Sequence, residues 1–215
     1  FVWQPLAAAA VLQVDDWDGE ISDWARRESP VFGSAESAES ASDDLRGASQ
    51  QAWLLSMLFV PSDEELQPWA RDKIQGYVVQ WSATYLASEL TSLGKSGFGR
   101  QRPDNSDERS LPSGHASAAF AYSTLARRNV DAMILPEAAR VGLDIGLVGL
   151  SAGSAWARVE AGKHYPSDVL VGAALGAFVA RFIDDAFLDV RGGARLTAFV
   201  DAATGAWSVG VGWTF

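Results

Sequence analysis

The sequence predicts an all-α fold, a helical bundle, followed by a short C-terminal β-hairpin. Apolar residues recur at helical spacing between residues 42 and 188, and helix-starting Ser, Pro and Asp residues separate successive runs. After residue 195 apolar and polar residues alternate instead, which is a strand pattern. A chain of 215 residues fits one domain, which we assign to residues 1–190, with the hairpin as a tail over residues 191–215.

The N-terminal segment, residues 1–46, is acidic. Between residues 15 and 46 ten Asp and Glu residues stand against three Arg residues, a pattern typical of a solvated face of short helices and loops. Ile21, Trp24 and Ala25 keep helical spacing, so we expect part of this segment to pack inward.

Five longer helices are predicted after this segment, over residues 42–60, 62–93, 113–128, 137 to 156 or 158, and 166–188. Pro61 ends the first, and Ser62-Asp63-Glu64-Glu65 resembles a capping box for the second. The last begins at Pro166-Ser167-Asp168, because proline suits a first turn and Asp favours a helix N-terminus. The apolar face of the second helix consists of Trp69, Ile74, Val78, Tyr85, Leu86, Leu90 and Leu93.

Two irregular regions complete the chain. Residues 94–111 are rich in Gly, Pro, Asn, Asp and Arg without a period, so we expect a long loop of the kind that often carries function. In the tail, apolar alternation over 196–200 is followed by a turn at 202–205 and by a second alternation over 207–215. A hairpin alone is barely stable, so we expect it to pack on the helices or on a membrane surface.

Composition excludes several classes of function. With 17 Lys and Arg against 27 Asp and Glu, the net charge of -10 argues against nucleic-acid binding. The chain has no cysteine and two histidines, so neither disulfides nor a metal site is expected. The most apolar stretches, residues 52–60, 141–157 and 169–180, are too short or too interrupted for a membrane span of about 20 residues. We therefore expect a water-soluble protein or a peripheral membrane protein.

Three segments carry the cations and both histidines that suggest chemistry. They are Lys95 to Pro103, Pro112-Ser113-Gly114-His115, and Arg158 to Asp168, which contains His164. Taken singly, each has an ordinary explanation as solvated loop charges, a common turn, or an incidental pair at a helix entrance.

Taken together, the three segments indicate an anion site. Lys95, Arg102 and Arg158 are suited to converge on an oxyanion, since the guanidinium fork matches phosphate. The N–H groups of Ser113 and Gly114, where a helix begins, are expected to donate to the same anion. An imidazole beside such a site can attack phosphorus or protonate a departing oxygen, and an Asp beside an imidazole would fix its tautomer.

The pattern Lys-x6-Arg-Pro, Pro-Ser-Gly-His and Arg-x5-His-x3-Asp resembles the signature of the type 2 phosphatidic acid phosphatase and vanadium haloperoxidase superfamily. Ten positions match, namely Lys95, Arg102, Pro103, Pro112, Ser113, Gly114, His115, Arg158, His164 and Asp168. The resemblance implies the helical bundle of that family. It covers residues 95–168 directly, and the acidic segment and the hairpin lie outside it.

The resemblance also implies roles. His164 would attack phosphorus and form a phosphohistidine, with Asp168 orienting it, and His115 would protonate the leaving oxygen and later help to activate water. The phosphate-binding groups would be Lys95, Arg102, Ser113, Gly114 and Arg158. No metal and no other cofactor is implied, because the cations stabilise the charge, and vanadate would act as an inhibitor.

One position departs from the family pattern. Ala157 stands where the family usually has a serine before the arginine of the third segment. The loss of one hydrogen-bond donor to a charged acceptor costs about 1.5–3 kcal/mol. We expect Ala157→Ser to restore that donor.

The function expected from this resemblance is a metal-independent phosphatase of phosphomonoesters or of lipid phosphates and diphosphates. One alternative is a vanadate-dependent haloperoxidase, with vanadate as its cofactor, although the family's haloperoxidases are generally much longer than 215 residues. Another is a phosphate- or lipid-headgroup-binding protein without turnover, which the histidine pair argues against.

The partner expected is a phosphorylated small molecule or a lipid phosphate, and the residues leave the choice open. Nine Trp residues and the apolar hairpin favour contact with a membrane surface, whereas burial of the Trp residues in the core is the alternative. The resemblance implies a periplasmic or secreted location, and Phe1-Val2-Trp3 lacks the basic start of a signal peptide.

Overall fold

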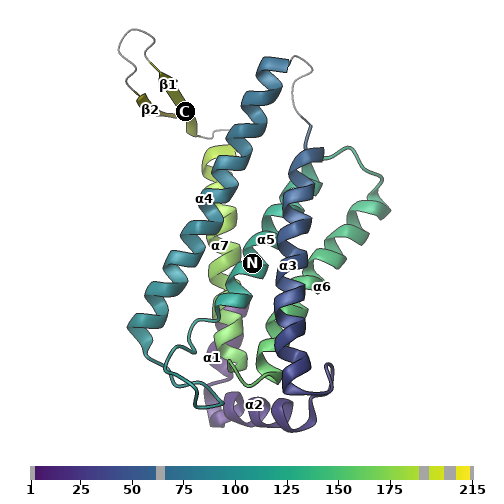
Figure 1. Cartoon of the computed structure of the whole chain (residues 1–215), viewed down its shortest axis with the longest axis vertical. Coiled ribbons are helices and arrows are strands. Elements are labelled where there is room, and N and C mark those ends of the chain that lie inside the picture. Colours follow the sequence, from purple (N-terminus) through teal and green to yellow (C-terminus); the bar gives the residue numbers. More distant parts are fainter. Residues whose placement is uncertain (1–2, 62–65, 189–193, 201–206, 214–215) are drawn as a thin grey trace.

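The computed structural model of the protein describes residues 3–61, 66–188, 194–200 and 207–213. These residues form the helices α1 (Trp3–Val11), α2 (Trp17–Glu28), α3 (Ala35–Phe59), α4 (Leu66–Phe98), α5 (Gly114–Ala132), α6 (Glu137–Glu160) and α7 (Pro166–Leu188), a short 3-10 turn η1 (Val14–Asp16), and the strands β1 (Ala194–Val200) and β2 (Trp207–Trp213). The predicted all-α fold of the main domain is confirmed (Figure 1).

Helix α5 is the centre of the bundle and packs against α3, α4, α6 and α7 (Figure 1). The core on its surface includes the buried side chains of Trp53, Leu125 and Val179. The indole of Trp53 stacks on the ring of Tyr122 with 5.4 Å between ring centroids, and its N–H donates to Gln80 Oε1 at 2.8 Å. A buried indole N–H needs such an acceptor, so this contact allows the largest core side chain to be fully buried.

Two glycines allow α7 to lie unusually close to the start of α5. A Cβ atom at Gly172 would lie 2.4 Å from the carbonyl oxygen of Ser113, and one at Gly176 would lie 2.0 Å from that of Ser117. Neither distance is compatible with a side chain. The close approach brings the first turns of the two helices together, where the candidate catalytic residues lie.

Part of the N-terminal acidic segment packs inward, as predicted, while most of its charged residues are exposed. Helix α2 lies across the end of the bundle where α3 begins (Figure 1). Asp18 is 2% exposed, and Ala25 is fully buried as expected, while Trp24 is 44% exposed and contacts Trp156. Helix α3 begins at Ala35 rather than at residue 42, because the Ser34 hydroxyl accepts a hydrogen bond from the Ser37 N–H as an N-cap.

The predicted apolar face of α4 faces outward rather than into the core. All seven of its residues are 37–67% exposed. The buried face consists of the smaller or polar residues Val79, Gln80, Ala83, Ala87 and Thr91. Small side chains let α4 lie close to α5 and α7, which leaves its large side chains outside. Despite this apolar surface, none of the helices in the described ranges is long and apolar enough to span a membrane.

The strands β1 and β2 pair in antiparallel register from Ala194 with Trp213 to Val200 with Trp207. The predicted turn at residues 202–205 lies outside the described residues, as does the predicted capping box at residues 62–65. The surface against which the hairpin packs stays a prediction.

Candidate active site

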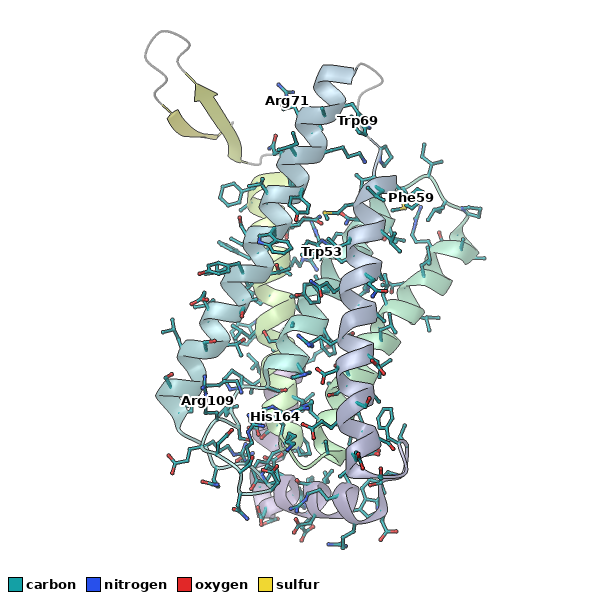
Figure 2. The ribbon with its side chains drawn as sticks, viewed as in Figure 1. Trp53, Phe59, Trp69, Arg71, Arg109 and His164 are labelled. Atoms are coloured by element: carbon teal, nitrogen blue, oxygen red, sulfur yellow. The ribbon has the colours of Figure 1, made fainter. Side chains whose placement is uncertain are left out.

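A cavity of about 310 Å³ opens at the end of the bundle where α4 and α6 finish and α5 begins. Figure 2 shows Arg109 and His164 at this end, far from Trp69 and Phe59. The residues that line the cavity are Lys95, Arg102, Asp107, Arg109, Gly114, His115, Arg158 and His164. Six of the eight site residues predicted from the sequence therefore surround one cavity; the exceptions are Ser113 and Asp168.

His164 is held as a neutral imidazole. It is 2% exposed, and its Nδ1 lies 2.7 Å from the carbonyl oxygen of Ser110. A carbonyl oxygen can only accept, so Nδ1 carries the proton and Nε2 keeps a lone pair. Burial lowers the pKa of His164 well below its usual range, and the nearby cations Lys95, Arg158 and Arg102 lower it further.

Asp168 supports His164 through an intermediate residue, which corrects the expected direct contact. Its Oδ2 lies 4.0 Å from His164 Nδ1, and it accepts hydrogen bonds from the Ser110 hydroxyl at 2.5 Å and the Tyr165 N–H at 2.9 Å. Ser110 thus binds Asp168 by its side chain and His164 by its carbonyl oxygen. Burial raises the pKa of Asp168, while the hydrogen bond from Ser110 and the charge of Arg100 oppose that shift.

His115 lies in the first turn of α5 and is paired with a carboxylate of α3. Its Nε2 lies 2.8 Å from Asp43 Oδ1. Burial lowers the pKa of His115, and the charge of Arg158 lowers it further, whereas the hydrogen bond to Asp43 acts in the opposite direction. His115 is less buried than His164, and the Asp43 carboxylate favours its protonated form.

Two of the cations come from the end of α4 and the loop after it. Lys95 Nζ donates to the carbonyl oxygen of Arg109 at 2.6 Å, and Arg102 Nε donates to Asp107 Oδ1 at 2.7 Å. Burial lowers the pKa of Lys95 to about 8, and the charges of Arg102 and Arg109 contribute to the shift. Lys95 is thus a cation that loses its proton in mildly alkaline solution.

Arg158 supplies the third cation from the last turn of α6. The residue is 5% exposed, and its Nη1 donates to the Ser42 hydroxyl at 3.2 Å. Its Nε is buried and has no hydrogen-bond partner among the residues that the structure describes. Buried N–H groups are nearly always paired, so this N–H can still donate to a further acceptor.

Gly114 lines the cavity, but Ser113 does not. The Ser113 N–H donates to the backbone carbonyl oxygen of Asp168 at 3.0 Å, and its hydroxyl caps α5 by accepting from the Ala116 N–H. The expectation that this N–H binds the anion is therefore corrected. Ala157 is fully buried and is not among the cavity-lining residues.

Several residues of the site were missed by sequence reasoning. Asp107, Arg109 and Ser110 belong to the loop that was expected to be functional, but nothing in the sequence distinguished them from other loop residues. Asp43 carried no signal, because it reaches His115 across 72 residues of sequence. Among the described residues, no group of three or more His, Cys, Asp or Glu side chains could hold a metal ion.

The fold and the cavity define a class: a helical-bundle protein in which two imidazoles and four cationic side chains line one cavity. The sequence model of the PAP2 superfamily matches residues 76–188. The chain belongs to the PAP2 superfamily.

Three proteins that are similar in sequence are named as phosphatases. The chain is 28% identical to a lipid A 1-phosphatase of Rhizobium johnstonii over 62% of both chains. It is 36% identical to a lipid A 1-phosphatase of Porphyromonas gingivalis, over 44% of this chain and 20% of that one. It is 32% identical to a decaprenylphosphoryl-5-phosphoribose phosphatase of Mycobacterium tuberculosis, over 50% of this chain and 59% of that one. The chain spans less than two thirds of the length of each of these relatives.

The fold has a solved counterpart. The crystal structure of a transmembrane PAP2 type phosphatidylglycerolphosphate phosphatase from Bacillus subtilis superposes with a TM-score of 0.59, covering 85% of this chain and 91% of that one. At 19% sequence identity, the likeness shows that the two proteins share a fold.

Proposed function

We propose that this protein is a metal-independent phosphatase that hydrolyses lipid phosphates through a phosphohistidine on His164. The observation that carries the proposal is the environment of His164: its Nδ1 faces the Ser110 carbonyl at 2.7 Å, so that Nε2 keeps a lone pair beside Lys95, Arg102 and Arg158. A neutral buried imidazole among cations is suited to attack a phosphoryl group.

In the first step, Nε2 of His164 attacks phosphorus while the bond from phosphorus to the leaving oxygen breaks. That oxygen takes a proton from protonated His115. In the second step, water attacks the phosphohistidine, His115 accepts a proton from the water, and the P–N bond breaks to release inorganic phosphate. The cations stabilise the negative charge of both transition states without a metal ion.

Three observations support lipid phosphates as the substrates. The names of the relatives specify lipid A and decaprenylphosphoryl compounds. A cavity of about 310 Å³ has room for a phosphate and its neighbouring atoms, so the apolar body of a lipid would stay outside. The exposed apolar side chains of α4 end near Lys95 and offer a surface for such a body.

Because the proposed substrates are lipids, we expect the protein to contact a membrane surface. The family resemblance supports a periplasmic or secreted location. Cell fractionation of a tagged full-length protein tests both. Recovery in the cytoplasmic fraction would contradict the location.

The nucleophile is tested with His164→Ala. The variant should lose at least about 1,000-fold in kcat on a polyprenyl phosphate in detergent micelles. Radiolabel from substrate should appear on the wild type and disappear on acid treatment, since phosphohistidine is acid-labile. Activity of His164→Ala close to that of the wild type would exclude the proposed nucleophile.

His115→Ala is the matched control, because the chain has only these two histidines. With p-nitrophenyl phosphate, whose leaving group needs little protonation, it should still form the labelled intermediate and hydrolyse it slowly.

Metal independence is tested with inhibitors of the wild-type protein. Activity should survive excess EDTA and fall with orthovanadate, which mimics the pentacoordinate transition state. Loss of activity with EDTA that Mg²⁺ restores would rule out the metal-independent route.

A further inference from the structure

We infer that Asp18, in the acidic N-terminal segment, is a positioning residue of the proposed active site. It holds Arg100 and the first turn of α7, and through them Asp168, Ser110 and His164. The inference rests on the proposed function. Asp18 lies outside residues 76–188, the part of the chain that matches the family.

Asp18 is built into the site rather than solvated. The residue is 2% exposed, and both of its carboxylate oxygens are occupied. Oδ1 accepts from the Ser167 N–H at 2.8 Å, and Oδ2 accepts from the Ser167 hydroxyl at 2.5 Å and from Arg100 Nη2 at 2.8 Å. A carboxylate at the exposed N–H groups of a helix start stabilises that turn, so Asp18 caps α7 from a distant part of the chain.

Arg100 links Asp18 to Asp168. Its Nη1 donates to Asp168 Oδ1 and to the Ser167 hydroxyl, both at 2.7 Å. The guanidinium carbon lies 4.1 Å from the centroid of the Tyr165 ring, which fixes the plane of the group. One cation thus lies between two buried carboxylates, and removal of either one leaves it free to shift.

The path from this ion network to the cavity has two further steps. Asp168 accepts from the Ser110 hydroxyl at 2.5 Å, and the Ser110 carbonyl oxygen lies 2.7 Å from His164 Nδ1. A displacement of Arg100 or Asp168 would therefore rotate the imidazole that must point at phosphorus. Lys95, Arg102 and Arg158 make no contact with Asp18 in this network, so binding of the phosphoryl group is separate from it.

Two other contacts attach the same N-terminal segment to the site. Arg26 Nη1 donates to the carbonyl oxygen of Pro103 at 2.8 Å. The buried carboxylate of Glu160 accepts from the N–H groups of Val31 and Phe32 at 3.1 and 3.0 Å. The segment thus touches the loop after α4, the end of α6 and the start of α7, which are three of the elements that carry site residues.

The first test compares Asp18→Asn with Glu20→Gln, an exposed residue on the same helix that undergoes the same loss of charge. In Asp18→Asn one oxygen becomes an N–H₂ group that faces another donor, so the network must rearrange. We expect kcat to fall by about 10- to 100-fold, as for other small misplacements of a reacting group, with KM within about twofold of the wild type. Asp18→Glu should recover part of kcat, and Glu20→Gln should match the wild type. An unchanged kcat in folded Asp18→Asn would overturn the inference.

The second variant is Arg100→Lys, which covers the case in which Asp18→Asn does not fold. Lysine keeps the charge but cannot reach Asp18 and Asp168 with a planar fork. It should show the same loss of kcat at nearly constant KM. Wild-type kcat in this variant would equally overturn the inference.

A readout without substrate separates this inference from the proposed function. Because the chain has two histidines, the imidazole C–H region of a ¹³C-¹H NMR spectrum contains one pair of signals for each. Asp18→Asn and Arg100→Lys should move the His164 signals and leave those of His115 in place. If the wild type hydrolyses no phosphate ester, the proposed function fails while this shift still decides the positioning role. His164 signals that coincide with those of the wild type in both variants would disprove it.

Discussion

His115 and Asp43 face each other at 2.8 Å between helices α5 and α3, although 72 residues separate them in the sequence. Asp43 also accepts a hydrogen bond from Arg46 at 3.1 Å, which fixes the carboxylate. Burial and the charge of Arg158 favour neutral His115, and Asp43 favours the protonated form. The proton that His115 would give to a leaving group therefore depends on a residue of the acidic segment.

Removal of the Asp43 charge should shift the pH dependence of the reaction. In Asp43→Asn the pKa of His115, already below its usual value, falls further, so less of the acid is protonated at a given pH. With an alkyl phosphate, the alkaline limb of kcat/KM should move to lower pH and the rate at pH 6 should fall about tenfold. p-Nitrophenyl phosphate should show little change. Asp44→Asn, an exposed neighbour, is the control. Equal effects on the two substrates would contradict the role of His115 as the acid.

Anion affinity should fall in alkaline solution because of Lys95. Its pKa of about 8 means that the free protein loses this positive charge as the pH rises through that value. Affinity for sulfate, whose charge is constant over this range, should then decrease by about tenfold per pH unit until the bound form also titrates. In Lys95→Arg the affinity should stay level from pH 7 to 9, since arginine remains charged. Calorimetry of sulfate binding measures both, and a level wild-type profile would contradict the assignment.

We expect Asp107 to compete with a bound anion for Arg102. Its carboxylate accepts from Arg102 Nε at 2.7 Å at the cavity wall and is 43% exposed. Asp107→Asn should therefore strengthen sulfate inhibition, by about twofold to fivefold for a partly exposed pair. Glu108→Gln, the exposed residue that follows, should leave the inhibition constant unchanged. Weaker inhibition in Asp107→Asn would show that the carboxylate organises the cations instead of competing for them.

Gly176→Ala tests the close contact between α5 and α7. The new Cβ would meet the Ser117 carbonyl oxygen at 2.0 Å, so the helices must separate, and we expect the free energy of unfolding to fall by about 1–3 kcal/mol or more. Gly149→Ala, in α6 with nothing within 4 Å, should instead raise it by about 1 kcal/mol. Urea unfolding followed by circular dichroism compares the two. A stabilised Gly176→Ala would mean that the helices lie further apart.

The helix starts near Pro136 and Pro166 could be predicted, because caps and prolines act within one turn. The start of α3 could not, because its first turns contain Ala, Ser and Glu residues without an apolar stripe. The orientation of α4 could not be predicted for a different reason. A helical stripe of large apolar residues shows that a helix has two faces, but neighbouring helices decide which face is buried, and α5 and α7 pack against its small residues.

In the site, too, residues that belong to short motifs could be predicted, whereas contacts between distant parts of the sequence could not. Lys95, Arg102, His115, Arg158 and His164 could be identified from their match to the family's sequence motifs, and they surround one cavity. The partners of the two imidazoles could not. Asp168, four residues from His164, was expected to touch it, but the carbonyl oxygen of Ser110 takes that place. Such contacts depend on how loops fold over helices, which short-range patterns do not encode.

The contact between Asp18 and Ser167, 149 residues apart, has a consequence for the order of folding. Closure of such a long loop costs conformational entropy before the contact is gained, so we expect this contact to form after the local helices. On refolding from urea, the helical signal at 222 nm should therefore recover before the ability to bind sulfate or to turn over substrate. During synthesis, too, the N-terminal helix would wait without its partner until α7 has emerged, so no partly made chain would hold a complete active site.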